Sequence, residues 1–289
     1  MNGDPRARGH RQVLYELNAW ARAAGAASCV ITFTRHPAEV LHGRALPMIL
    51  SLKHRLQEFE RLGVDAAAVL DFAAVQELDP QAFLREVLLG RLGCRRLLLG
   101  FDSRIGKDRA GDASNLPALG APLGVEVRIA SRVADREGRK IGSSAIRDAI
   151  LGGALEAAAN MLGRPVALRG RVVPGAGRGK GLGTATANLD VEGELLPPDG
   201  VYLVRVFCGA ETAPGVANLG RRPTFGAEGE RAFEVHVPGW TGEKYGETFE
   251  VRLVRRIRPE IRFPDATALR AQIARDLEEL ARAVASGEV

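Results

Sequence analysis

The sequence is poor in cysteine and aromatic residues and has no long apolar run. Its three cysteines, Cys29, Cys94 and Cys208, lie far apart, which excludes a disulfide framework and the paired spacing of a zinc site. Aromatic residues make up only 5% of the chain, too few for the stacking surface of a nucleic-acid-binding barrel. No apolar stretch approaches the roughly 20 residues of a membrane-spanning helix, and no signal-peptide pattern opens the sequence. We therefore expect a cytoplasmic protein that binds neither nucleic acid nor a membrane.

Length and composition predict a two-domain globular protein. The chain has 289 residues, of which 46% are hydrophobic and 26% are charged, enough to bury a sizeable core. The 40 Lys and Arg residues exceed the 35 Asp and Glu residues and give a formal charge of +5. This modest excess suits nucleotide substrates. The sequence leaves the oligomeric state open between a monomer and a weak homo-oligomer.

The first half of the chain alternates helical and strand-like segments. Amphipathic spacing predicts helices over residues 11–24, 51–62, 80–92 and 143–162. Short apolar runs predict strands over residues 29–33, 66–70, 96–99 and 125–129. This α/β alternation is typical of a doubly wound parallel sheet, which binds ligands at the carboxyl ends of its strands.

The pattern changes after Gly163-Arg164-Pro165. Short β-like runs, separated by Gly and Pro turns, cover residues 166–173, 201–207, 214–218, 232–237 and 247–254. They predict an antiparallel barrel or sandwich. One-faced apolar spacing predicts a terminal helix that begins near Asp265, a good N-cap residue. We accordingly expect two domains, residues 1–162 and residues 163–289.

A glycine-rich, cationic loop followed by a Thr-x-Asn pair is the most informative motif. The loop residues are Gly175, Arg178, Lys180 and Gly181, and the pair is Thr186 and Asn188. Glycines let backbone amides approach an anion, and the two cations add positive charge. Residues two apart in a strand face the same side, so Thr186 and Asn188 would present two oxygen ligands to Mg²⁺. The motif suggests phosphoryl transfer, but a Gly-rich hairpin whose Thr and Asn satisfy backbone groups has the same pattern.

Phosphoryl transfer also needs a group that accepts the proton of the attacking alcohol. Alternation along residues 233–237 directs Phe233 and Val235 to the core, and Glu234 and His236 to the opposite face. Glu234 is therefore the candidate base. From spacing alone, a solvated outer-face residue is the alternative for Glu234, and a structural role is the alternative for His236.

As an ensemble, the motifs of the second half resemble the riboflavin kinase domain of bacterial bifunctional riboflavin kinase/FMN adenylyltransferases. The matching blocks are residues 170–173, 180–183, 186–188, 200–202, 215–224, 234–236, 245–246, 257–260 with Phe263, and 272–273 with Asp276. The resemblance implies a six-stranded Greek-key β-barrel with a terminal helix that binds MgATP and riboflavin and forms FMN. It assigns the metal and phosphates to Thr186 and Asn188, and deprotonation of the ribityl 5′-hydroxyl to Glu234. It assigns flavin binding to Arg222, Thr224 and Arg258.

This half departs from the family at one point. The family usually has Gly-Phe-Pro-Thr-Ala-Asn, whereas residues 183–188 lack both the Phe and the Pro. The expected metal ligands are kept, but the stiffening by Pro and the packing by Phe are lost. We therefore expect a kinase with weakened activity.

The first half resembles the nucleotidyltransferase domain of the same enzymes. The matching segments are residues 8–11, 32–37, 100–106 and 141–147. The resemblance implies an adenylyltransferase-like site with Gly9, His10, Asp102, Arg104, Ser143, Ser144 and Arg147. Two serines at a helix N-terminus, with an arginine one turn on, form a reasonable phosphate site. In isolation, the same serines are equally typical of a plain helix cap.

The start of the first half departs further from the family. Ala7 stands where the family has the first histidine of a His-x-Gly-His element, and Pro5 stands where it has Gly. The strand that precedes this element in the family is not in the sequence, and a late start or degeneration of this half would account for that. Such histidines neutralise charge that builds up on the phosphates. Ala7 therefore argues against FMN adenylylation, while the ancestral fold is still expected.

The sequence thus predicts a flavin-biosynthetic enzyme that uses Mg²⁺, ATP and riboflavin. The alternative is a flavin- or nucleotide-binding regulator that has lost catalysis, which Ala7 and the missing proline would favour. The presence of Glu234, Thr186 and Asn188 argues for the enzyme.

Overall fold

The computed structural model of the chain describes residues 8–43, 47–131, 142–175, 186–191, 193–221, 231–240 and 244–289. Contacts between Cα atoms divide the chain into two compact units. Unit 1 comprises Met1–Met48 and Leu52–Ser143, and unit 2 comprises Ile49–Ser51 and Ser144–Val289. This division falls upstream of the boundary expected from the sequence. Within the described residues, we find no helix with the length and apolarity that a membrane span requires.

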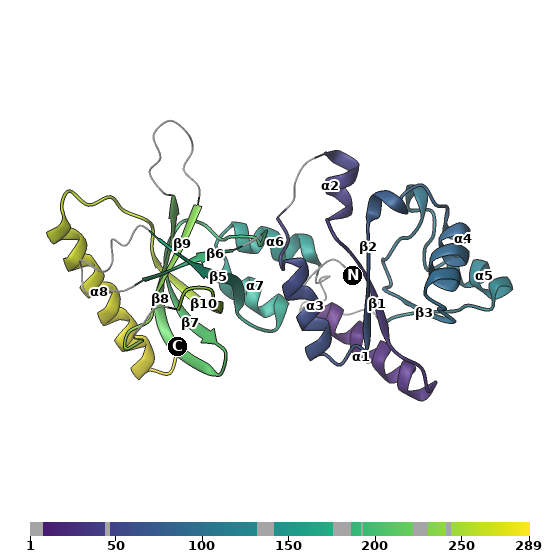
Figure 1. The fold of residues 1–289 in the computed structure, drawn as a ribbon, viewed down its shortest axis with the longest axis horizontal. Helices are drawn as coiled ribbons and strands as arrows, with labels where there is room; N and C mark the ends of the chain where they lie inside the picture. Colours follow the sequence, from purple (N-terminus) through teal and green to yellow (C-terminus); the bar gives the residue numbers. More distant parts are fainter. Residues whose placement is uncertain are drawn as a thin grey trace. The chain divides into compact units, whose positions relative to one another are not determined.

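Unit 1 contains two pairs of parallel strands with helices around them (Figure 1). Strand β1 (Cys29–Phe33) pairs with β2 (Ala66–Leu70), and β3 (Arg96–Leu99) pairs with β4 (Glu126–Ile129). The helices are α1 (Arg8–Ala23), α2 (Pro37–His42), α3 (Leu52–Arg61), α4 (Pro80–Ala82), the π-helix η2 (Phe83–Arg91) and α5 (Leu116–Gly120). Short 3₁₀ turns are η1 (Phe72–Ala74), η3 (Lys107–Arg109) and η4 (Ala121–Leu123). The four predicted strands and their parallel pairing are confirmed.

The segment predicted as one α-helix over residues 80–92 has a different winding. It begins as α4, with Asp79 Oδ1 accepting a hydrogen bond from Ala82 N at 2.8 Å, and continues as the π-helix η2. Four apolar side chains of η2 are buried in one core with Leu99 of β3 and Leu116 of α5. The apolar spacing therefore predicted the buried face correctly, but packing decided the winding.

A serine and an aspartate tie together the starts of β1 and β2. Asp65 Oδ2 accepts hydrogen bonds from Ser28 N at 2.8 Å and from Ser28 Oγ at 2.9 Å. Asp65 N donates to Ser28 Oγ at 3.1 Å. Because these donors favour the charged carboxylate, they lower the pKa of Asp65 below its ordinary value of 3.8.

Unit 2 contains a closed barrel of six antiparallel strands. They are β5 (Val166–Val173), β6 (Thr186–Asp190), β7 (Gly200–Cys208), β8 (Glu211–Arg221), β9 (Arg231–His236) and β10 (Thr248–Arg258). Their order around the barrel is β10-β5-β6-β9-β8-β7, and β10 closes on both β5 and β7. Strands β7, β8 and β9 form a meander and β10 returns beside β7, which is the Greek-key arrangement. The predicted Greek-key barrel is confirmed.

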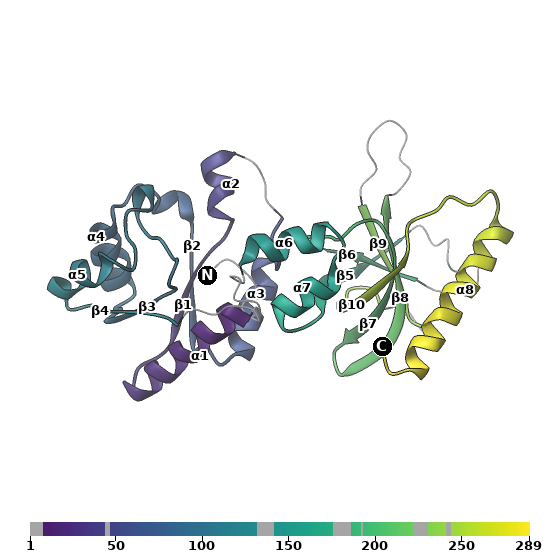
Figure 2. The same ribbon diagram turned by 180° about the vertical axis from the view of Figure 1, so that it is seen from behind.

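The terminal helix α8 (Ala266–Ala285) lies along the outside of the barrel beside β8, drawn in yellow in Figures 1 and 2. Leu280 and Ala283 of this helix pack in one buried cluster with Leu203 of β7. Asp265 caps the helix, because its Oδ1 accepts a hydrogen bond from Ala268 N at 2.8 Å. The predicted helix and its cap are therefore confirmed.

The prediction of a single helix over residues 143–162 was wrong. The structure has two helices there, α6 (Ser143–Leu151) and α7 (Leu155–Leu162). Gly153 between them has φ = 75°, a conformation that glycine adopts without steric cost and that ends the first helix. Helix α7 packs on β5 and β10, so the second helix belongs with the barrel.

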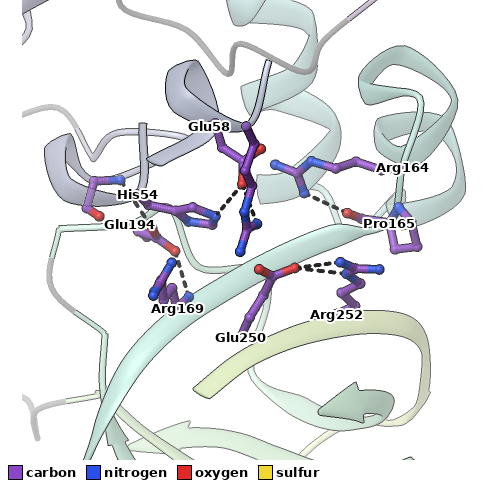
Figure 3. Close-up of polar contacts among 10 residues, drawn as sticks. His54, Glu58, Arg164, Pro165, Arg169, Glu194, Glu250 and Arg252 are labelled. Atoms are coloured by element: carbon purple, nitrogen blue, oxygen red, sulfur yellow. Dashed lines mark hydrogen bonds and ion pairs between the residues drawn. The ribbon is translucent and has the colours of Figure 1, made fainter. Parts of the chain in front are cut away.

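A buried glutamate joins residues 49–51 to the barrel. Glu194 is only 4% exposed, and its two carboxylate oxygens accept hydrogen bonds from different backbone segments. Ser51 N donates to Oε1 at 3.1 Å. Arg169 N on β5 donates to Oε2 at 2.9 Å (Figure 3). These contacts explain why a three-residue segment from the first half of the chain belongs to unit 2.

Candidate active site

A row of polar side chains crosses three neighbouring strands of the barrel. Asn188 on β6 is the register partner of Glu234 on β9, and Glu234 is the register partner of Asn218 on β8. Directly opposed residues of antiparallel strands point to the same face, with their Cβ atoms about 4.5–5.5 Å apart. The structure therefore places an amide, a carboxylate and a second amide side by side.

This row lies on the outer face of the barrel. The alternate residues Phe233 and Val235 on β9 are 3% and 1% exposed, and their register partners Leu219 and Ala217 on β8 are fully buried. These residues fill the barrel interior, so Glu234 faces outward, as the alternation in the sequence predicts. Glu234 itself is half-buried.

Thr186 lies next to this row on the same face of β6. It stands two residues before Asn188, and its register partner on β9 is His236. The Thr186 hydroxyl and the Asn188 amide therefore share a face, the geometry that their spacing predicts for two oxygen ligands.

The start of the glycine-rich loop lies against the Asn188 side chain. A Cβ atom added to Gly175 would lie 2.0 Å from Asn188 Nδ2 and 2.5 Å from Asn188 Cγ. Only glycine leaves room for the amide in this position, and Asn188 is 7% exposed. The contact places Gly175, the first residue of the loop, beside the polar row. The other predicted loop residues, Arg178, Lys180 and Gly181, lie outside the described residues, as do the predicted flavin-binding residues Arg222 and Thr224.

Three side chains of this surface make no polar contact with the part of the chain that the structure describes. Among the described residues, no hydrogen bond or ion pair reaches the side chain of Thr186, Glu234 or Asn218. Asn and Glu are depleted in strands, and here they stand beside one another in the middle of the sheet. A hydroxyl, amides and a carboxylate gathered in this way can bind a hard cation and a substrate alcohol.

Arg258, predicted to bind flavin, is engaged with helix α8. Its Nη2 donates to Asp276 Oδ2 at 2.7 Å and its Nε donates to Asp276 Oδ1 at 3.0 Å. Gln272 Nε2 donates to the same Oδ1 at 2.9 Å, and Asp276 is 6% exposed. This bidentate pair holds α8 to β10, a role that spacing did not indicate.

The structure also shows two residues near this surface that the sequence did not single out as functional. Asn218 is the last residue of the strand predicted over residues 214–218. Glu260 follows β10, and its carboxylate lies against Gly220. A Cβ atom added to Gly220 would be 2.2 Å from Glu260 Oε1. A polar residue two positions before a glycine was the available signal for Asn218, but finding its partner Glu234 requires the register of β8 on β9.

The predicted adenylyltransferase-like residues of unit 1 lie in two places. Gly9 and His10 lie in the first turn of α1, which begins three residues earlier than predicted. Asp102 and Arg104 lie in the loop after the carboxyl end of β3, and Arg104 Nη2 is 3.7 Å from Asp112 Oδ2. Ala7 and Pro5 lie outside the described residues.

The predicted phosphate site at residues 143–147 lies at the start of α6. Ser143 is the last residue of unit 1, and Ser144 and Arg147 belong to unit 2. They are therefore assigned to a different unit from His10 and Asp102. Among the described residues, no hydrogen bond reaches the buried Nε of Arg147, which leaves a donor for an anion at this helix start.

The fold defines a class of protein, a closed six-stranded antiparallel β-barrel joined to an α/β unit. Two family models match the chain in the same order. The FAD synthetase model matches residues 6–145, and the riboflavin kinase model matches residues 162–284.

Curated relatives extend over both units. The chain is 34% identical over 280 residues to the bifunctional riboflavin kinase/FMN adenylyltransferase of Pseudomonas fluorescens, covering 96% of this chain and 89% of the relative. It is 34% identical to the protein of the same name from Escherichia coli K12, covering 93% and 86%. The relative of this name from Bacillus subtilis is 31% identical, covering 95% and 88%. The chain belongs to the bifunctional riboflavin kinase/FMN adenylyltransferase family.

A solved structure has the same architecture. The chain is similar to a crystal structure described as a macrolide-efflux protein from Streptococcus pneumoniae, with 32% identity and a TM-score of 0.83. The match covers 96% of this chain and 91% of that chain, so the likeness includes both units.

Proposed function

We propose that unit 2 transfers the γ-phosphoryl group of ATP to the terminal ribityl hydroxyl of riboflavin and forms FMN. The observation that carries the proposal is the row of Asn188, Glu234 and Asn218, with Thr186 beside it. Family membership indicates flavin biosynthesis, and this row supports the placement of the kinase reaction on β6, β8 and β9.

The residues beside Gly175 fit a magnesium ion. Mg²⁺ prefers oxygen ligands and usually keeps substrate phosphates and water in its coordination shell. The Thr186 hydroxyl and the Asn188 amide provide such oxygens on one face. When bound, the ion would neutralise charge on the transferred phosphoryl group. The glycine-rich loop would bring backbone amides and the charges of Arg178 and Lys180 to the same phosphates.

Glu234 is placed to act as the general base. Its side chain is half-buried and has no partner among the described residues, so it can accept the proton of an incoming alcohol. In the transfer, the hydroxyl oxygen forms a bond to the γ-phosphorus as the bond from that phosphorus to the β,γ-bridging oxygen breaks. The hydroxyl proton passes to Glu234, and ADP leaves with the bridging oxygen.

We also propose that unit 1 retains the fold of an FMN adenylyltransferase but adenylylates FMN slowly or not at all. His10, Asp102 and Arg104 support the ancestral site. The replacement of the first histidine by Ala7 argues against efficient transfer, because a donor to the developing phosphate charge is missing.

The proposed reaction uses small molecules that a cytoplasmic enzyme would meet, and we propose that location. It needs no nucleic acid, membrane or partner protein, and we propose a monomer or a weak homo-oligomer.

One assay tests both activities. Purified protein is incubated with riboflavin and MgATP, and riboflavin, FMN and FAD are separated by chromatography. FMN without FAD is the expected result, and removal of Mg²⁺ with EDTA should abolish its formation. Substantial FAD would show that unit 1 works despite Ala7. Neither product, with riboflavin still bound, would favour a regulator instead of an enzyme.

A further inference from the structure

Asn218 belongs to the polar row, but the proposed phosphoryl transfer assigns it no role. It lies on β8, on the opposite side of Glu234 from the proposed metal ligands, and its register partners are Glu234 on β9 and Val201 on β7. Neighbouring strands are about 4.8 Å apart, so its amide is one strand spacing from the proposed base.

The surroundings of Asn218 do not explain an asparagine at this position. Its neighbours in sequence, Ala217 and Leu219, are fully buried in the barrel interior, so Asn218 faces outward. Two residues earlier on the same face, Val216 packs against the apolar cluster that includes Leu280 of α8. Asn218 is half-buried, and no hydrogen bond reaches its side chain within the described part of the chain. An apolar or β-branched residue would suit the strand better.

The order of the groups across the strands indicates which part of the substrate lies near the Asn218 amide. The proposed phosphate and metal side is β6, with Thr186 and Asn188, and the proposed base is on β9. The attacking and leaving oxygens of phosphoryl transfer lie roughly in line. The carbon chain that carries the attacking hydroxyl must therefore extend away from β6, past Glu234 and toward Asn218.

We propose that Asn218 binds the substrate's polyol chain, by a hydrogen bond between its side-chain amide and a hydroxyl next to the one that is phosphorylated. This inference rests on the proposed kinase function. An amide can both donate to and accept from a hydroxyl, whereas it gains nothing from a methylene group. Asn218 therefore selects flavins with a hydroxylated side chain over flavins with a plain alkyl alcohol.

The test compares two substrates. One is riboflavin, and the other is a flavin whose N10 substituent is 5-hydroxypentyl, which keeps the terminal hydroxyl and lacks the other three. Asn218→Ala should lower kcat/KM for riboflavin about tenfold, which corresponds to one neutral hydrogen bond. It should leave kcat/KM for the hydroxypentyl flavin unchanged, and Asn218→Ser should recover part of the loss with riboflavin.

Matched controls separate this role from a structural one. Thr212→Ala, at an exposed position of the same strand, should change neither substrate's kinetics. An equal loss with both substrates would show that Asn218 acts through Glu234 or the fold, and no loss with riboflavin would also overturn the inference. If the parent protein phosphorylates neither flavin, the proposed function itself fails, which is a distinguishable result.

Discussion

Gly175→Ala offers a direct test of the contact between the glycine-rich loop and the proposed metal site. The added Cβ would lie 2.0 Å from Asn188 Nδ2 and 2.5 Å from Asn188 Cγ, whereas real Cβ contacts are essentially never under 3.0 Å. Either the amide or the loop must therefore move by about an ångström. If the amide moves, the proposed ligand oxygen moves with it, because both belong to one planar group.

The expected magnitude follows from that displacement. A misplacement of about 1 Å in a catalytic arrangement costs on the order of 100-fold in rate, about 2.7 kcal/mol of transition-state stabilisation. We expect Gly175→Ala to lower kcat for FMN formation by this factor. Initial rates at saturating riboflavin and MgATP, followed by chromatography, measure the effect.

A double-mutant cycle identifies the cause. In an Asn188→Ala background the amide is gone, so Gly175→Ala should cost little more than Asn188→Ala alone. A full further loss in that background would refute the steric argument and assign the effect to the loop itself. Wild-type activity of the single variant would refute the role of Asn188.

Three further outcomes are expected. Glu234→Gln should lower kcat about 10²–10⁴-fold while riboflavin binding, followed by flavin fluorescence, changes little; an equal loss of binding would contradict its role as base. Asp276→Ala should destabilise unit 2 by about 3 kcal/mol in urea titrations, because it leaves the Arg258 guanidinium without its buried partner. Asp65→Asn should lower the melting temperature at neutral pH. Since the folded pKa of Asp65 lies below its unfolded value, its stabilisation is present above about pH 3.8 and is lost as the pH falls through the folded pKa. The two melting temperatures should therefore converge in acid, and a constant difference would contradict the assignment.

Local pattern was sufficient for the strands and for the facing of side chains along each strand. The apolar runs at residues 29–33, 66–70, 96–99 and 166–173 are strands with the predicted bounds. Alternation placed Glu234 outside the barrel and Thr186 and Asn188 on one face, because the two-residue period of a strand is a local property. The segment over residues 143–162 was predicted as one helix but forms two, because Gly153 between them takes a positive φ that apolar spacing does not reveal.

Sequence patterns were enough to predict the strand segments, an antiparallel barrel or sandwich, a shared face for Thr186 and Asn188, and the outward direction of Glu234. Three contacts could be found only in the folded chain: Asn218 stands beside Glu234, Gly175 lies against Asn188, and Arg258 pairs with Asp276. Each of these contacts joins residues distant in sequence. Their register is set by hairpin geometry and by packing of the whole barrel, which no local periodicity encodes.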